Sequence, residues 1–451
     1  MAPGAVSPAF EEVFRDSYSK HEAIVVFRPA STPRLRTRGR LRALDQRLRQ
    51  IAEHAAAQES LQRNVLERYI SDFGDSVQHG DSLAADEVGS SILNVATTEV
   101  TPESLNGLAE RPEVLAVMPN QAVRVIRPRS IDYRDISAQE ISSGLTWGLQ
   151  RLEIPRLWAS TKGADINVAV LDTGVHAVHP ALDGRVGNFV VIDALGRRIE
   201  AHPDFDCASH GTHVCGTIAG GNAILGGKTV SIGVAPEARL SVAAVLMGDA
   251  TLRTLLEGIS WAVERGADII SMSLGFTYYE PLFAEIFDML ISRYGVLPVV
   301  AIGNENHGNT SSPGNAYNAL GVGAVEELSD GALNVPSFSS GASLVFPGTP
   351  NSFVTKPDVV APGAHVLSCV PPQRRPHGMY EYSYMDGTSM ATPHVAGVAA
   401  LLMSSYPDAE VSRIIEAIRE TAKHPAGQEL RPDNRWGFGI IHPLEAFKAL
   451  S

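Results

Sequence analysis

The chain has 451 residues, 44% hydrophobic and 19% charged, with three cysteines, so it is too long for a single hydrophobic core, which stops growing at about 250 to 300 residues, and too poor in cysteine for a disulfide scaffold. The net charge of −13 falls almost wholly on residues 131–451, which hold 33 acidic and 21 basic residues. Because phosphate binding needs a concentrated basic face, this balance argues against nucleic acid as a partner.

The first part of the chain, residues 1–127, predicts a small α+β domain. Its expected elements in chain order are a strand over 21–27, a helix over 41–69, a strand over 92–100, a helix opening at Thr101 and a strand over 114–125. Thr101 and Pro102 are typical of a helix start, since threonine caps and proline suits the first turn. Residues 128–146 are polar and have no apolar period, which predicts a linker.

Residues 147–451 alternate between strand and helix patterns. Apolar runs predict strands over 166–171, 240–246, 268–274, 296–302 and 320–325, and helices over 251–265 and 281–294 fall between them. Strands that are apolar on both faces suit a sheet covered on both sides, so the fold class is α/β with a doubly wound, mostly parallel sheet. The functional site of such a sheet lies at the carboxyl ends of its strands.

Two segments bear on localisation. The first residues lack the basic start and apolar run of a secretory signal, so a cytoplasmic location is expected for the chain as written, and secretion if the true start lies upstream. Residues 387–407 contain no Asp, Glu, Lys or Arg, but they include Pro393, His394 and small polar residues. This favours a buried helix of a globular domain over a membrane span, and we expect no membrane partner.

Four polar residues fall where the predicted strands end or helices begin. Asp172 ends an apolar run, His210 precedes a helix of small residues, Asn304 follows a strand, and Ser389 opens a helix. Pro393 has no N–H, so the carbonyl of Ser389 loses its helical donor. Singly, each residue has another interpretation: a turn or cap for Asp172, Asn304 and Ser389, and a core histidine or metal ligand for His210. Together they supply the groups that nucleophilic catalysis needs.

The segments around these residues are similar to those of the subtilisin-like serine proteases, in which Asp, His and Ser follow in this chain order. The matching segments are VAVLDTGV, HGTHVCGTIAG, SMSLG, VVAIGN and GTSMATPHVAG, and the similarity runs from residue 147 to the end. The resemblance implies that Ser389 attacks the scissile carbonyl, that His210 transfers its proton and that Asp172 orients His210. Asn304 and the backbone N–H of Ser389 are the implied oxyanion donors.

The resemblance also implies contacts with protein or peptide substrates. The implied walls of the pocket for the residue before the cut are Ser273, Leu274, Gly275, Ala301 and Gly303. These stretches carry no charge, so we expect a broad preference for apolar or aromatic side chains. His213 and His394 belong to the motifs without a chemical role. We interpret Cys215 as a buried, inert thiol, with sensitivity to mercurials or oxidation as the alternative.

Many members of this family hold a structural calcium ion partly through an Asp, and that position is Ala181 here. Calcium takes six to eight oxygen ligands with several carboxylates. Residues 220–233 contain no acidic residue. We therefore expect no cofactor and no metal ligand set at this place, and a structural calcium ion is the alternative.

The N-terminal domain resembles the inhibitory propeptide of the same family in AIVVF, in ILNVATTEVTPESLNGLAERPEVLAVMPN and in the strand that follows. The resemblance implies a proenzyme whose residues 1–127 assist folding and inhibit the cleft, with self-cleavage between Ile126 and Gly148. Propeptides usually accompany secretion, whereas the chain as written starts without a secretory signal. An intracellular protease needs restraint, so a retained N-terminal domain or an activating protein partner is a further hypothesis. The rival interpretation is a silent or regulated protease fold that serves as a binding module. The related serine carboxyl peptidases should carry Glu in place of the catalytic His, so His210 argues against that class.

Overall fold

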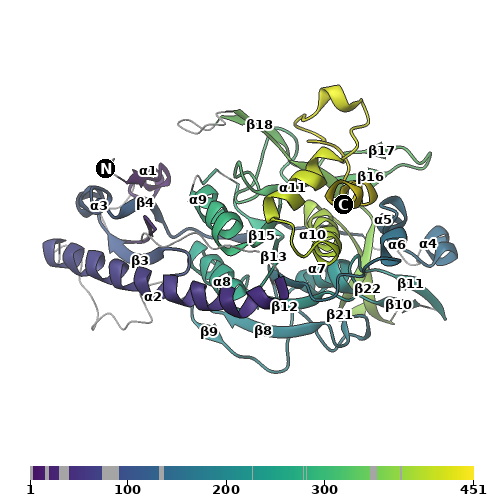
Figure 1. Cartoon of the computed structure of the whole chain (residues 1–451), viewed down its shortest axis with the longest axis horizontal. Helices are drawn as coiled ribbons and strands as arrows, with labels where there is room; N and C mark the ends of the chain where they lie inside the picture. The colour runs from purple at the N-terminus through teal and green to yellow at the C-terminus, as the bar shows by residue number, and fades with distance from the viewer. Residues whose placement is uncertain are drawn as a thin grey trace.

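The structure is a computed structural model that describes residues 4–15, 20–29, 40–73, 91–131, 137–225, 227–277, 279–280, 282–345, 353–375 and 378–451. A small N-terminal unit lies at one side of a larger α/β unit (Figure 1). The small unit has its own hydrophobic core, which includes Phe27, Tyr69 and Leu108. The larger unit has an apolar core on each side of its sheet.

The N-terminal unit is a four-stranded sheet covered by helices. Its strand order is β1 (Ala5–Val6), β4 (Val114–Pro119), β2 (His21–Phe27) and β3 (Val95–Val100). β2 is antiparallel to both β3 and β4. The helices are α1 (Ala9–Val13), α2 (Arg40–Phe73) and α3 (Pro102–Ala109). Thr101 caps α3, because its side chain accepts the N–H of Ser104, as its sequence position predicts.

The strand predicted over 114–125 is two strands in the structure. After β4 the chain leaves the N-terminal sheet, and β5 (Arg124–Val125) pairs antiparallel with β14 (Leu274–Gly275) of the larger unit. The N–H of Leu252 donates to the carbonyl of Gln121, and the N–H of Val123 donates to the carbonyl of Ala250. The chain therefore changes sheets because its backbone groups find their partners in the larger unit.

The larger unit contains a nine-stranded sheet whose central pairs are parallel, as predicted. Its order is β17 (Leu333–Asn334), β16 (Leu320–Glu327), β15 (Leu297–Ala301), β13 (Ile269–Met272), β7 (Asn167–Asp172), β12 (Arg239–Ala244), β8 (Val186–Ile192) and β9 (Arg198–Ile199), with β20 (Val359–Pro362) beside β16. The short strands β9 and β17 pair antiparallel at its edges. The strand predicted over 268–274 is interrupted at Ser273, which separates β13 from β14.

Helices cover both faces of this sheet. One face carries α5 (Trp147–Arg151), α6 (Ile154–Trp158), α7 (His210–Ala219), α10 (Thr388–Ser405), α11 (Val411–Glu420) and α12 (Pro443–Leu450). The other carries α8 (Leu252–Glu264), α9 (Leu282–Asp288) and the π-helical turn η3 (Met289–Tyr294), which ends the helix predicted over 281–294. Val168 and Val170 of β7 enter the first core, and Ala169 and Leu171 enter the second. Burial on both faces explains the apolar strand sequences.

Shorter elements complete the chain. They are the hairpin of β10 (Asn222–Leu225) and β11 (Lys228–Ser231), the hairpin of β18 (Ala342–Val345) and β19 (Phe353–Lys356), and the 3₁₀ turns η2 (Pro180–Leu182) and η4 (Gln428–Leu430). Residues 388–403 of α10 are buried within the protein. Within the described part of the chain, none of the helices combines the length and apolar character that crossing a membrane requires.

The segment 128–146, predicted as a linker, contains regular structure. β6 (Arg129–Ile131) pairs antiparallel with β22 (Gly378–Asp386), which pairs in turn with β21 (Val366–Arg375). The helix α4 (Ala138–Ser143) follows, and its Glu140 is buried and accepts the Trp147 N–H at 2.9 Å and the Tyr384 hydroxyl. This segment therefore forms regular structure without an apolar period, because its polar groups find partners in the larger unit. Its role as the linker between the two units stays a prediction.

Candidate active site

Asp172 and His210 are in contact at the carboxyl edge of the sheet. Asp172 is the last residue of β7, His210 is the first residue of α7, and Asp172 Oδ1 lies 2.7 Å from His210 Nδ1. Asp172 Oδ1 also accepts the Thr173 N–H at 2.7 Å, and both side chains are buried. Burial lowers the pKa of His210, but the charge and hydrogen bond of Asp172 outweigh it, so the pKa lies above its ordinary value.

Ser389 lies in the first turn of α10, and α10 packs against α7. The Ser389 Oγ donates to the backbone carbonyl of Ile126 at 2.8 Å. Among the described residues, no group forms a hydrogen bond with His210 Nε2, which is buried. The hydrogen bond from Ser389 Oγ to His210 Nε2, through which a serine would pass its proton to this histidine, is therefore not formed while Ser389 donates to Ile126.

The carbonyl of Ser389, which Pro393 deprives of its helical donor, has another partner. The Ser273 Oγ donates to it at 3.1 Å, and both groups are buried. An unpaired buried carbonyl would cost about 1–3 kcal/mol, so this hydroxyl stabilises the first turn of α10. Ser273 was predicted only as a pocket wall. The missing N–H of Pro393 was the signal that a side-chain donor was needed nearby.

The side chain of Asn304 has a fixed orientation. Its Oδ1 accepts the Thr388 N–H at 2.9 Å and the Thr388 Oγ1 at 3.0 Å. Because the amide oxygen is held by α10, the amide nitrogen is directed to the other side, where Nδ2 donates to the Arg127 carbonyl at 3.0 Å. A fixed amide that donates to a peptide carbonyl beside a serine is suited to stabilise an oxyanion.

A segment of the N-terminal unit lies against Ser389 and residues 273–275. In the β5–β14 pair Val125 lies opposite Leu274 and Arg124 lies opposite Gly275, and the N–H of Ile126 donates to the Ser273 carbonyl at 3.3 Å. This segment adds a strand to the edge of the larger unit, which is how extended peptides bind to sheet edges. The three predicted wall residues 273–275 therefore contact a peptide backbone.

The other two predicted wall residues, Ala301 and Gly303, lie at and just beyond the end of β15. Gly303 has a φ of 118°, and a Cβ there would lie 2.3 Å from Glu305 Oε2. Glu305 Oε2 accepts the Ser311 Oγ at 2.9 Å. A carboxylate therefore lies beside the stretch that was predicted to carry no charge, and sequence reasoning missed it although Glu305 follows Asn304 directly. The role of Ala301 and Gly303 as pocket walls stays a prediction.

The remaining motif residues lie in the interior. Burial lowers the pKa of His213 to about 3 and that of His394 to about 4. His213 Nε2 lies 3.0 Å from the Val366 carbonyl, and His394 Nδ1 lies 2.8 Å from the Met390 carbonyl. Burial raises the pKa of the Cys215 thiol well above its ordinary range, and the thiol is inaccessible. These contacts support structural roles for all three residues.

The residues at the place of the family's calcium ion do not fit a calcium site. Ala181 contributes only its carbonyl, which accepts the Gly221 N–H at 2.8 Å. The guanidinium of Arg185 donates through Nε to the Ala219 carbonyl at 2.9 Å and through Nη1 to the Asp183 carbonyl at 2.8 Å. Two backbone oxygens of the kind that bind calcium are therefore paired with a cationic side chain.

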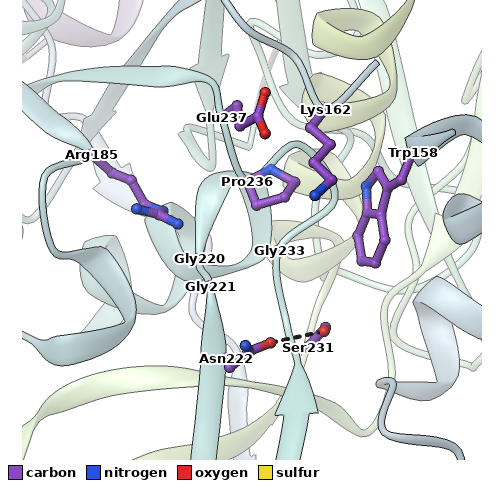
Figure 2. Close-up of a pocket in the computed structure, with 10 residues that line it drawn as sticks. All are labelled: Trp158, Lys162, Arg185, Gly220, Gly221, Asn222, Ser231, Gly233, Pro236 and Glu237. Atoms are coloured by element: carbon purple, nitrogen blue, oxygen red, sulfur yellow. Dashed lines mark hydrogen bonds between the residues drawn. The ribbon is translucent and has the colours of Figure 1, made fainter. Parts of the chain in front are cut away.

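Figure 2 shows this place at the end of α7, where Arg185 extends toward the turn at Gly220 and Gly221. A cavity of about 360 Å³ adjoins it, lined also by Lys162 and Trp158. In the described part of the chain, no three His, Cys, Asp or Glu side chains gather in a way that could hold a metal ion.

Comparison with known proteins agrees with this geometry. The model of the subtilase family matches residues 163–439. An alkaline protease of Shouchella clausii is 30% identical over 406 residues, which are 86% of this chain and 92% of that protein. Subtilisin E of Bacillus subtilis (strain 168) is 33% identical over 319 residues, which are 68% of this chain and 75% of that protein.

The crystal structure of fervidolysin from Fervidobacterium pennivorans, described as a keratinolytic enzyme related to subtilisin, has the same fold, with a TM-score of 0.70 and 23% identity. The match covers 99% of this chain but only 63% of that one. Together, the fold and the matches define a serine endopeptidase of the subtilisin type. The chain belongs to the subtilase family.

Proposed function

We propose that Asp172, His210 and Ser389 form the catalytic triad of this endopeptidase and that the chain is synthesised as a proenzyme inhibited by its own N-terminal domain. The observation that carries the proposal is the 2.8 Å hydrogen bond from Ser389 Oγ to the carbonyl of Ile126. It places a peptide of the N-terminal domain against the nucleophile, 263 residues away in sequence. A substrate has no access to Ser389 while this peptide is in place.

The chemistry follows from the groups at the site. With a substrate bound, Ser389 Oγ attacks the carbonyl carbon while His210 Nε2 takes its proton, and Asp172 stabilises the resulting imidazolium. Asn304 Nδ2 and the N–H of Ser389, which lies in the first turn of α10, donate to the oxyanion. His210 then protonates the leaving amine. Water hydrolyses the acyl-enzyme by the same transfers, which restores the Ser389 hydroxyl.

The strand register favours one processing bond. Arg124, Val125 and Ile126 are held in succession by Gly275, Leu274 and the Ser273 carbonyl. Ile126 is the last residue of this antiparallel pairing, so the bond between Ile126 and Arg127 follows the strand directly. Cleavage one residue later would make the tertiary amide nitrogen of Pro128 the leaving group.

Cleavage requires a small rearrangement. Asn304 Nδ2 binds the carbonyl of Arg127, whereas the carbonyl of Ile126 accepts from Ser389. For attack at Ile126, its carbonyl has to turn to Asn304 and displace that of Arg127. Ser389 is then free to donate to His210 Nε2. The arrangement is therefore that of an uncut, inhibited chain.

The test is the intact mass of the purified full chain beside its Ser389→Ala variant, with the N-termini of all fragments sequenced. We expect the wild type to yield a fragment that begins at Arg127 and the variant to stay whole. The control is Ser292→Ala, because Ser292 is an exposed serine that donates to the Asp288 carbonyl and it should leave cleavage unchanged.

Each other outcome overturns a defined part of the proposal. If Ser389→Ala processes itself in isolation, Ser389 is not the nucleophile. If the wild type splits at another bond, the assignment of Ile126 fails although the triad stands. If the wild type does not split, the self-processing proenzyme is wrong. If the chain also fails to react with a labelled fluorophosphonate after limited proteolysis has removed the N-terminal unit, the interpretation as a silent protease fold is correct instead.

A further inference from the structure

The loop before α7 carries a carboxylate with an unusual set of partners. Asp206 Oδ1 accepts the Thr173 Oγ1 at 2.7 Å and the Ala208 N–H at 3.0 Å. Asp206 Oδ2 accepts both the N–H and the Oγ1 of Thr212, at 2.7 and 2.6 Å. One side chain therefore binds the residue after Asp172 and the residue two after His210.

The two backbone segments that it joins are in direct contact. A Cβ at Gly211 would lie 2.1 Å from the Gly174 carbonyl oxygen, and a Cβ at Gly174 would lie 2.1 Å from the Phe205 carbonyl oxygen. Gly174 has a φ of 115°, a conformation that favours glycine. The loop after β7 and the first turn of α7 thus approach as closely as their backbones allow, and no bulk separates Asp172 from His210.

The threonines complete a reciprocal network. The Thr173 Oγ1 that donates to Asp206 accepts the Gly211 N–H at 3.0 Å, and the Thr212 Oγ1 that donates to Asp206 accepts the His176 N–H at 3.0 Å. Each threonine hydroxyl therefore lies on one of the two backbone segments and accepts a hydrogen bond from an N–H of the other segment. Asp206 is the acceptor for the Thr212 hydroxyl and the nearer acceptor for that of Thr173, whose Oγ1 also lies 3.2 Å from Asp172 Oδ1. Because Asp206 draws the protons of both hydroxyls, it orients their lone pairs toward those N–H groups.

We propose that Asp206 is a positioning residue of the proteolytic reaction, which fixes the relative placement of Asp172 and His210 through Thr173 and Thr212. The inference rests on the proposed function, because the placement matters only if these two residues belong to the triad. A shift of about 1 Å between catalytic groups can cost about 100-fold in rate. A network that holds both backbones from one carboxylate prevents such a shift.

Asp206 also acts on His210 through its charge. The groups that face the imidazole are Asp172 at the end of β7, Asp206 in the preceding loop and His213 one turn along α7. Cys207 lies in the same loop, and burial together with Asp206 raises the pKa of its thiol, which keeps it neutral. The negative charge of Asp206 favours the protonated form of His210. Removing that charge therefore moves the titration of His210 to lower pH.

The experiment compares Asp206→Asn with wild type in two assays, the rate of self-cleavage of the full chain and the turnover of a peptide substrate by the processed enzyme. We expect kcat to fall by about 10- to 100-fold with KM nearly unchanged. We also expect the acid limb of kcat/KM to move to lower pH. The control is Asp204→Asn, which removes the same charge from the same loop beside His202 and should change neither quantity.

A second variant separates position from charge. Thr212→Val removes one hydroxyl of the network but keeps the carboxylate, so it should lower kcat without moving the acid limb. If circular dichroism shows that Asp206→Asn is unfolded, the kcat of Thr212→Val tests the positioning role in its place. The inference is overturned if folded Asp206→Asn keeps both the kcat and the acid limb of the wild type. It is also overturned if Thr212→Val keeps the wild-type kcat. A processed wild type that fails to react with a fluorophosphonate overturns the proposed function instead.

Discussion

At the scale of single residues, the proposed mechanism makes the buried pair of Asp172 and His210 the determinant of the pH range of activity. The carboxylate lies 2.7 Å from the imidazole Nδ1, and it raises the pKa of His210 although burial opposes this. Below that pKa the imidazole is protonated and cannot take the proton of Ser389. Above it, the imidazole is neutral and is the base of the proposed mechanism.

We therefore predict that kcat/KM of the processed enzyme rises as the pH increases through the raised pKa of His210. The midpoint of this acid limb should lie above about 6.5, the ordinary value for histidine. The measurement is the pH profile of kcat/KM with a neutral peptide substrate, so that only the enzyme titrates. An optimum near pH 4 would contradict the assignment of His210 as the base.

At the scale of elements, α7 is held at both of its ends. His210 at its start contacts Asp172, and the carbonyl of Ala219 at its end accepts the Arg185 guanidinium. A cation at the C-terminus of a helix opposes the partial negative charge of its free carbonyls. Arg185 therefore places a positive charge at the C-terminal end of α7.

We predict that Arg185→Ala destabilises the protein by about 1.5–3 kcal/mol, the range for hydrogen bonds to charged groups. The loss should be the same in excess calcium and in a chelator, since no three acidic side chains gather among the described residues and Arg185 already pairs with the backbone oxygens at this place. The measurement is thermal unfolding with calcium and with a chelator, made on proteins that also carry Ser389→Ala so that they do not digest themselves. Arg156→Ala is the matched control, because Arg156 pairs with Glu153 on the surface. Calcium that restores the lost stability would show that this place binds the metal.

At the scale of the whole molecule, the N-terminal unit contacts the larger unit at more places than the cleft. Leu48 and Ile51 of the long helix α2 pack into the core that α8 also enters. Glu22 pairs with Arg253 at 2.8 Å, and the Tyr294 hydroxyl donates to the Ile92 carbonyl. None of these contacts depends on the peptide bond after Ile126.

We predict that the two fragments stay associated after the bond between Ile126 and Arg127 is cut. They should elute together in size-exclusion chromatography, and casein hydrolysis should remain low until the N-terminal fragment is degraded. The segment 129–131 should also remain paired with β22, since that pairing lies entirely after the cut. Full casein activity at the moment of cutting, or in chain that has not been cut, would contradict this prediction.

The amino-acid sequence by itself determined the parts of the protein that depend on neighbours in the chain. The parallel strands appear as apolar runs because each is buried on both faces, and the residues 172, 210, 304 and 389 stand at the ends of such runs or at helix starts. A strand end or a helix start is a local property. Its residues could therefore be read as a candidate site before any contact was known.

Only the tertiary structure decided which distant groups meet. The contact between Ser389 and Ile126 spans 263 residues, and that between Tyr384 and Glu140 spans 244. The roles of Asp206 and Arg185 likewise depend on backbone groups of other elements. Such hydrogen bonds leave no periodic pattern in the sequence, because a polar side chain looks the same whether it faces water or a distant partner. Folding distinguishes the two, since a polar group that leaves water must find a partner in the fold.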